Sequence, residues 1–368
     1  MLIQPNVRPL RYDPADEELE AGEAETIQAL CKTFDKIQSK TLEDEGRPIR
    51  AVHAKSWGLV DGELTVDPDL LPEYSQGIFS QSGKSYRVVL RFSAIPGDIL
   101  PDEITAPRGL SIKIFGVEGD RLSGSEGDTT QDFVMTNGKH FQDPSLKVFL
   151  ANLTPLAATT DKVEGLKKVM AATNRVVEAG LEAVGIESAH IKGFGGQPMT
   201  HPLGESFYSG GAIRWGDFVA KVSVTPASQN LKALTDQKVD VRGKPDGFRE
   251  AVAEELRRNG GEWNVSVQLR NSSDMPIEDA SKDWPEDDAP YLPVGRITVK
   301  PQTGWSEERA HVVDDAMFFS VWHGIEAHRP LGRIMRGRKE TYRHAQEFRS
   351  QHNGCPFMEP RDFSGLPG

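Results

Sequence analysis

The segment Tyr86-Arg-Val-Val-Leu-Arg-Phe-Ser-Ala-Ile95 has the composition of a β-strand, and a glycine before it and Pro-Gly after it mark turns. Because side chains alternate between the two faces of a strand, Arg91 and Ser93 share a face with Val89. If that face lies in a core, the arginine needs an anion there, since a buried unpaired charge is costly. The alternative is that this face is exposed to solvent.

Further strands are predicted on both sides of this segment. Residues 108–115 alternate well, and residues 131–137 form a strand that ends at Asn137. Two series of strands, with helices between and after them, predict an α+β fold: an antiparallel β-barrel, closed or nearly closed, with inserted and C-terminal helices. The other predicted strands are 50–60, 212–216, 218–224, 262–270 and 291–299, and the predicted helices are 23–40, 145–153, 161–183, 248–258 and 336–349.

The composition is that of a globular protein: of 368 residues, 37% are hydrophobic and 27% charged. A net charge of −12 argues against nucleic acid or an anionic membrane as a partner. We find no secretory signal and no apolar run of about 18 residues, so we expect a cytoplasmic protein without a membrane span. We expect an N-terminal arm (1–22), one barrel domain with flanking helices (23–353) and a C-terminal tail (354–368).

The predicted C-terminal helix carries an unusual stripe. At about 100° per residue, Arg338, Tyr342 and Arg349 fall within roughly 40° of one another. A phenol normally titrates near pH ~10, and neighbouring positive charge favours its ionised form. A phenolate between arginines suits a ferric ion, but the helix taken alone is better explained as a basic amphipathic helix with one tyrosine packed into the core.

A series of short segments, in order along residues 48–350, resembles the haem catalases, and in particular the small catalase-related peroxidases. The matching segments are Arg50-Ala-Val-His53-Ala-Lys, Leu90-Arg-Phe-Ser93, Asp132-Phe-Val-Met-Thr-Asn137, Trp263-Asn-Val-Ser-Val-Gln, Trp284-Pro, Tyr291-Leu-Pro-Val-Gly-Arg, Gly324-Ile-Glu and Arg338-Lys-Glu-Thr-Tyr342.

The resemblance implies a site around haem b (iron protoporphyrin IX). Tyr342 would be the proximal iron ligand as tyrosinate, with Arg338 stabilising the phenolate. His53 would be the distal acid and base, oriented by Ser93, with Asn137 as a second distal hydrogen-bond donor.

The remaining site residues implied by the resemblance contact the porphyrin. Phe149 would pack on its distal face, and Val52 would line the site beside the distal histidine. The haem propionates would be met by Arg50, Arg91 and Arg349, because guanidinium groups bind carboxylates in bidentate geometry.

The implied activity is the decomposition of hydrogen peroxide or an organic hydroperoxide by heterolytic O–O cleavage through a ferryl intermediate. The partners would be a small peroxide substrate and a small organic reductant. Relatives that rearrange fatty-acid hydroperoxides to allene oxides tend to have threonine before the distal histidine, where this chain has Val52. An isomerase or lyase of that kind is the alternative enzyme, and a haem-binding scaffold without turnover is the non-enzymatic one.

Two further expectations remain open. His323 and His328 form an alternative pair of haem ligands, which we leave out of the site because they match nothing on the proximal side. The chain lacks most of the long N-terminal arm that helps to lock the tetramer of full catalases. A homo-oligomer is therefore compatible with the sequence, but that tetramer is not implied.

Overall fold

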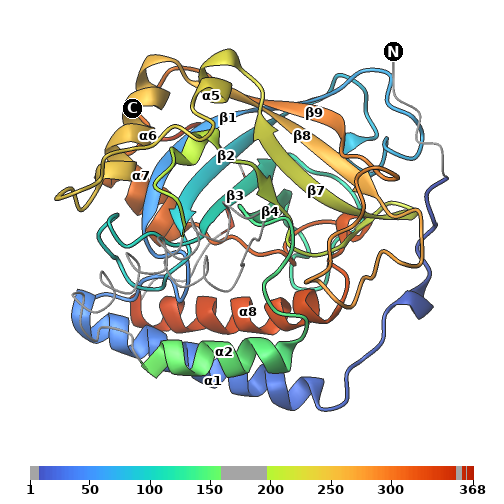
Figure 1. Cartoon of the computed structure of the whole chain (residues 1–368), viewed down its shortest axis with the longest axis horizontal. Coiled ribbons are helices and arrows are strands. Elements are labelled where there is room, and N and C mark those ends of the chain that lie inside the picture. Colours follow the sequence, from blue (N-terminus) through green and yellow to red (C-terminus); the bar gives the residue numbers. More distant parts are fainter. Residues whose placement is uncertain (1–7, 159–196, 354–358, 362) are drawn as a thin grey trace, which may run out of the picture.

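The barrel is the centre of the molecule in the computed structural model, which describes residues 8–158, 197–353, 359–361 and 363–368 (Figure 1). Strand order β5-β4-β3-β2-β1-β9-β8-β7 closes on itself because β5 also pairs with β7, and β6 extends the sheet from β7. Every pairing is antiparallel. The strands are β1 (Ser56–Val66), β2 (Ser85–Ala94), β3 (Arg108–Phe115), β4 (Thr130–Thr136), β5 (Phe207–Tyr208), β6 (Ile213–Trp215), β7 (Phe218–Pro226), β8 (Gly261–Leu269) and β9 (Leu292–Val299).

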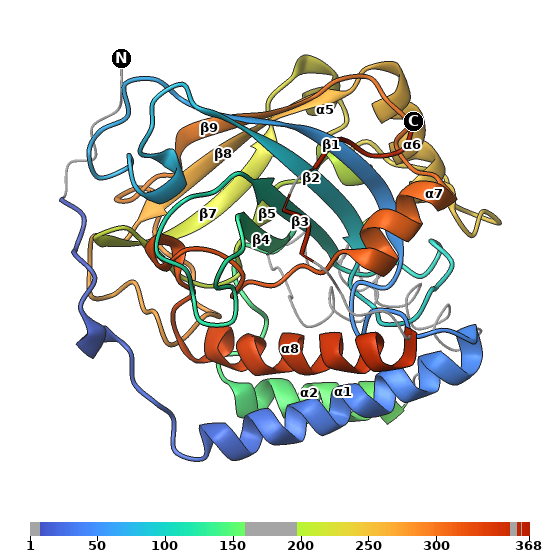
Figure 2. The same ribbon diagram turned by 180° about the vertical axis from the view of Figure 1, so that it is seen from behind.

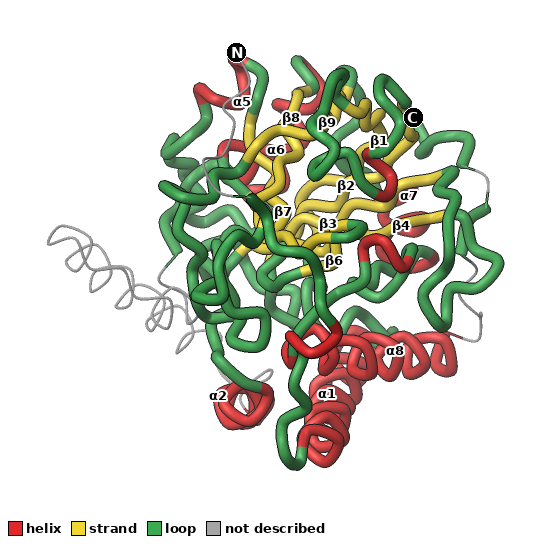
Figure 3. The backbone as a smooth tube through the Cα atoms, turned by 90° about the vertical axis from the view of Figure 1, so that its right-hand side faces the viewer, coloured by secondary structure: helices red, strands yellow, loops and turns green. Residues whose placement is uncertain are grey.

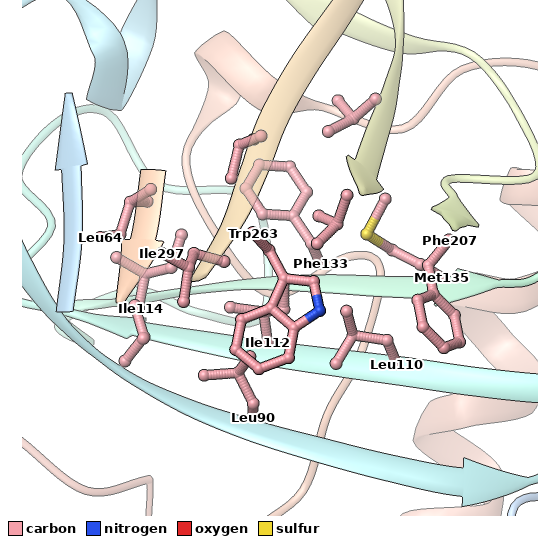
Figure 4. Packing of buried hydrophobic residues seen from close by; sticks show 14 of the residues in the cluster. Leu64, Leu90, Leu110, Ile112, Ile114, Phe133, Met135, Phe207, Trp263 and Ile297 are labelled. Carbon is pink, nitrogen blue, oxygen red and sulfur yellow. The ribbon is translucent and has the colours of Figure 1, made fainter. Parts of the chain in front are cut away.

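The alternation of side chains along the strands separates two cores. In β2, Leu90 points into the barrel, where it packs in one cluster with Ile112 and Trp263 (Figure 4). Phe92 belongs to the same cluster. Val89, on the other face, belongs to a second cluster outside the barrel, with Leu59, Phe319 and Met335 among its members. The predicted period of two is therefore confirmed, and the face that carries Arg91 lies under the C-terminal part of the chain.

Three long helices form a layer on one side of the barrel (Figures 1 and 2). They are α1 (Glu23–Glu45), α2 (Leu146–Ala158) and α8 (Arg333–Asn353). An apolar cluster that includes Leu30 of α1, Leu153 of α2 and Ile334 of α8 holds the layer together. The Arg336 guanidinium also pairs with Glu23 at 2.7 Å. Figure 3 shows the same three helices grouped at one end of the molecule, away from the strands.

The other helices among the described residues lie along the barrel. They are α5 (Gln229–Ala233), α6 (Gly247–Arg258) and α7 (Glu307–Ala310), with 3-10 turns at Pro14–Asp16, Gly77–Phe79, Pro202–Gly204 and Glu326–His328. After α7 the chain continues as one π-helical turn, His311–Ala316. In the part of the chain that the structure describes, no helix combines the length and the apolarity required to cross a bilayer.

One predicted strand is wrong at its start. The strand expected over residues 50–60 begins only at Ser56, so His53 lies in the loop before β1 and not in the barrel wall. The backbone N–H groups of His53 and Ala54 bond to the carbonyl oxygens of Ile95 and Pro96, at 2.7 and 3.0 Å, outside the β1–β2 ladder. The helix predicted over 161–183 lies outside the described residues.

Candidate functional site

His53 is fixed by contacts with two strands. Its backbone φ of 57° is uncommon for a residue other than glycine. Its Nδ1 lies 3.0 Å from the Ser93 hydroxyl in β2, as the predicted orienting role requires. Its ring lies against Gly109 in β3, so closely that a Cβ on that glycine would come within 2.3 Å of the ring Cε1. The imidazole therefore has one defined position.

The surroundings of His53 keep its ring neutral. Burial is the main cause, and the positive charges of Arg91 and Arg338 add to it; together they lower the pKa of His53 to about 3. A neutral imidazole has one nitrogen that can accept a proton. At neutral pH this histidine can accept a proton and later return it.

Tyr342 and Arg338 occupy successive turns of α8 and contact each other, as the helical stripe predicted. An Arg338 Nη2 donates to the Tyr342 hydroxyl at 2.8 Å, and the guanidinium also lies 5.2 Å from the centre of the phenol ring. Tyr342 packs against the cluster outside the barrel that contains Val89. Ala51 and Val52, just before His53, pack in the same apolar cluster as Ile334 and Ala345 of α8, so this helix lies close to the His53 loop.

The three arginines expected at the propionates converge in the structure. Arg91 and Arg349 are buried, and burial together with the charges of Arg349 and Arg91 lowers the pKa of Arg50 well below its ordinary value. Arg50 donates to the carbonyl oxygens of Val313 and Met317, at 2.9 and 2.8 Å. Arg349 donates to the carbonyl oxygen of Asp314 at 2.6 Å.

A carboxylate that the sequence did not reveal lies among these arginines. Asp314, whose side chain is 16% exposed, pairs with the Arg91 Nε at 2.5 Å. The structure thus supplies Arg91 with an anion from its own chain, and the contact of Arg91 with a propionate stays a prediction. Among the described residues the Nε of Arg50 is buried without a hydrogen-bond partner, so the cluster has a donor that a ligand oxygen could occupy. Such a site fits a ligand that carries carboxylates.

Asn137 lies just after β4, next to the strand on which the His53 ring lies. Its Oδ1 accepts the backbone N–H of Arg108 at 2.9 Å, while its Nδ2 donates to Glu205 at 2.7 Å and to Gln197 at 3.2 Å. Glu205 also pairs with the buried guanidinium of Arg108. The carboxamide is thus held by its neighbours, and its predicted donation to a substrate remains untested.

Val52 and Phe149 lie at the inner edge of the helical layer. Both pack against the cluster that includes Leu30 and Ile334, and the Phe149 ring meets that of Phe141 edge-on at 5.3 Å. Their predicted contacts with a porphyrin also remain predictions.

The two histidines left out of the site have structural partners. His323 Nε2 lies 2.6 Å from the Thr130 hydroxyl, and His328 Nε2 accepts the backbone N–H of Ile78 at 3.1 Å. The His328 ring also packs against Trp215, with centroids 4.7 Å apart. These hydrogen bonds fix both imidazole rings within the packed barrel.

Comparison with known proteins shows what the chain is similar to. No family model matches the chain. Its sequence is 26% identical over 267 residues to a catalase of Schizosaccharomyces pombe, covering 68% of this chain and 49% of the relative. It is 23% identical over 370 residues to a peroxisomal catalase of Toxoplasma gondii, covering 92% and 66%. The fold matches catalase A from Saccharomyces cerevisiae with a TM-score of 0.58 at 18% identity, covering 88% of this chain and 67% of that one. The chain is a distant relative of the catalases.

A second solved structure, a fungal catalase, gives a TM-score of 0.57 at 18% identity over 88% of this chain and 62% of that one. The catalase-like chain spans about half of the length of the Schizosaccharomyces pombe catalase and about two thirds of that of the Toxoplasma gondii catalase. Catalases generally bind haem, and the residues of this chain fit that group. The phenol of Tyr342 with Arg338 suits iron, and the Arg50 Nε, which has no partner among the described residues, suits a carboxylate oxygen.

Proposed function

We propose that this catalase-like chain binds haem b and decomposes hydrogen peroxide or an organic hydroperoxide by heterolytic cleavage of the O–O bond. One observation carries the proposal. A neutral, oriented imidazole at His53 lies within electrostatic reach of the Arg338–Tyr342 pair on a different element. A haem bound there would have an acid–base group on one face and a phenol oxygen suited to iron on the other.

The residues on the proximal side would bind the haem and fix its position. Tyr342 would supply the iron ligand, and the guanidinium of Arg338, which donates to the phenol oxygen at 2.8 Å, would hold that oxygen in place. Arg50 and Arg349 would meet the carboxylates of the cofactor, because guanidiniums pair with carboxylates in fixed geometry. When bound, haem supplies the iron that coordinates a peroxide oxygen and the electrons that break the O–O bond.

His53 would move the proton. Because Nδ1 faces the Ser93 hydroxyl, Nε2 is the nitrogen left to face a substrate. It would take the proton from one peroxide oxygen and deliver it to the other, which leaves as water or as an alcohol. A pKa of about 3 means that the proton is held only briefly, so the ring is neutral again for the next turnover. A second peroxide or a small organic reductant would then return the enzyme to its starting state.

Haemin titration of the purified chain, followed by an oxygen electrode, tests the proposal. Haem should bind stoichiometrically, and added hydrogen peroxide should then be consumed. Oxygen release indicates a catalase, and oxidation of a dye without oxygen indicates a peroxidase. Consumption of a fatty-acid hydroperoxide without a reductant would instead show an isomerase, and a chain that binds no haemin would refute the proposal.

The variant His53→Ala tests the distal role. It should retain haem and lose about 10²- to 10⁴-fold of peroxide turnover, the range expected when a general acid–base group is removed. His140→Ala is the matched control, because His140 pairs with Asp283 at the surface. Turnover that is unchanged in His53→Ala would exclude this histidine from the reaction.

A further inference from the structure

A continuous chain of contacts joins Asp314 to the backbone of His53. Both carboxylate oxygens of Asp314 are bonded: Oδ1 accepts from Arg91 Nε at 2.5 Å, and Oδ2 accepts from the Ser56 hydroxyl at 2.6 Å. Ser56 is itself held by Trp305, whose Nε1 donates to it at 2.9 Å. With its Nε fixed in this way, Arg91 turns its Nη2 to the carbonyl oxygens of His53 and Ala54, at 2.6 and 3.3 Å.

The His53 backbone needs such support. A non-glycine residue in the left-handed region persists only where its surroundings hold it there. The N–H of His53 is held by Ile95, its ring is confined by Ser93 and Gly109, and its carbonyl is held by Arg91. Of these contacts, the Arg91 bond is the one that depends on a further side chain, because Asp314 holds the guanidinium of Arg91.

We propose that Asp314 is a positioning residue for His53, which acts by holding Arg91 on the His53 loop. This proposal rests on the proposed function of the site. It gives Arg91 a second task, beside the contact with a ligand carboxylate that the sequence resemblance implies.

The charges of the cluster imply that Asp314 opposes the binding of a ligand carboxylate but supports the position of His53. Burial opposes the ionisation of Asp314, but the charges of Arg91 and Arg50 outweigh it, and the pKa of the carboxyl lies below its ordinary value. Asp315, beside the cluster, pairs with Arg47 and His311 toward the surface, and its charge also acts on Arg50 and Arg349. An ionised Asp314 therefore repels an incoming carboxylate while it holds Arg91 in place. Its removal should leave haem binding as tight as before, or tighter, while His53 loses its position.

The position of His53 can be measured without activity, by hydrogen exchange in the haem-free protein. The amides of His53 and Ala54 bond to Ile95 and Pro96, so they report directly on the loop. In Asp314→Ala we expect these two amides to exchange at least about 10-fold faster, since local opening should cost less. In Asp314→Asn an oxygen remains to accept from Arg91, and we expect exchange close to that of the unsubstituted chain.

The haem-loaded protein gives the second readout. Asp314→Ala should lose about 10- to 100-fold in kcat, as expected for a displaced catalytic group, with haemin affinity unchanged or higher. Asp314→Asn should restore most of kcat. The control Asp315→Ala removes the neighbouring carboxylate, whose side chain pairs with Arg47 and His311 and not with Arg91, and should leave amide exchange and kcat unchanged.

Several results would overturn the proposal. One is slow exchange of both amides in Asp314→Ala, and another is a parallel fall of haemin affinity and turnover, which a purely structural ion pair would give. If Asp314→Ala does not fold, Arg91→Lys takes its place. A lysine keeps the charge but cannot reach Asp314 and the His53 carbonyl together, so it should show the same faster exchange. If the unsubstituted chain binds no haem, the proposed function fails, and hydrogen exchange still decides the role of Asp314.

Discussion

Gly109 in β3 is the support on which the His53 ring lies, and Gly109→Ala tests this contact. A Cβ at this position would lie 2.3 Å from the ring Cε1 and 2.5 Å from Nδ1, whereas ordinary contact begins at 3.4 Å. The ring would have to retreat by about 1 Å, a displacement that can cost about 10²-fold in rate. It cannot retreat freely, because Ser93 and the Arg91-bound carbonyl hold it on two other sides.

We therefore expect Gly109→Ala to fold, with a loss of about 1–3 kcal/mol in unfolding free energy from overpacking. Turnover per bound haem should fall by about 10²-fold. The assay is oxygen release or dye oxidation at equal haem content, with haem measured by its absorbance and stability by denaturant unfolding.

Gly261→Ala in β8 is the matched control. A Cβ there would lie 2.6 Å from the Leu231 Cδ1, so the steric cost is similar, but the contact is with a leucine and not with the candidate site. This variant should lose stability and keep its turnover per haem. A folded Gly109→Ala protein whose turnover stays within about twofold of the unsubstituted chain would refute the geometric reasoning about His53.

Two further predictions concern haem and pH. Tyr342→Phe removes the phenol oxygen that Arg338 contacts, so haemin should bind more weakly and with a shifted spectrum; an identical titration and spectrum would exclude this tyrosine as the ligand. Burial lowers the pKa of His53 and of His328 to about 3, against about 6.5 in the unfolded chain. The unfolded state therefore binds more protons between these values, and stability present above pH ~6.5 should be lost as the pH falls toward about 3. Unfolding at several pH values should show a shallower acid loss in His328→Gln than in the unsubstituted chain, and equal slopes would contradict the assignment.

Local periodicity explains which parts of the structure could be predicted from the sequence. The period of two in residues 86–95 placed Arg91 and Ser93 on one face with Val89, and β2 has this arrangement. The helical period placed Arg338 beside Tyr342, and their side chains meet at 2.8 Å. Both relations involve residues a few positions apart on one element, where backbone geometry alone fixes the neighbours.

The tertiary structure decided the partners of the charged groups. Arg91 bonds to Asp314, 223 residues further along the chain, and Asn137 bonds to Glu205, 68 residues away. No period in the sequence connects such pairs, because they meet only when the barrel closes and the C-terminal segment folds over it. The conformation of His53 is of the same kind: its predicted strand gives way to a loop because bonds to Ile95, Pro96 and Arg91 take its backbone groups.

For this protein, then, the sequence determined which residue types lie on which face of each strand and helix, since those faces follow from the short-range geometry of the backbone. The ordered set of matching segments also indicated the family. Only the folded chain decided how the buried charges are balanced. That balance depends on which groups from distant segments come within a few ångströms of one another, and the three-dimensional packing alone brings Asp314 to Arg91 and Arg338 close to His53.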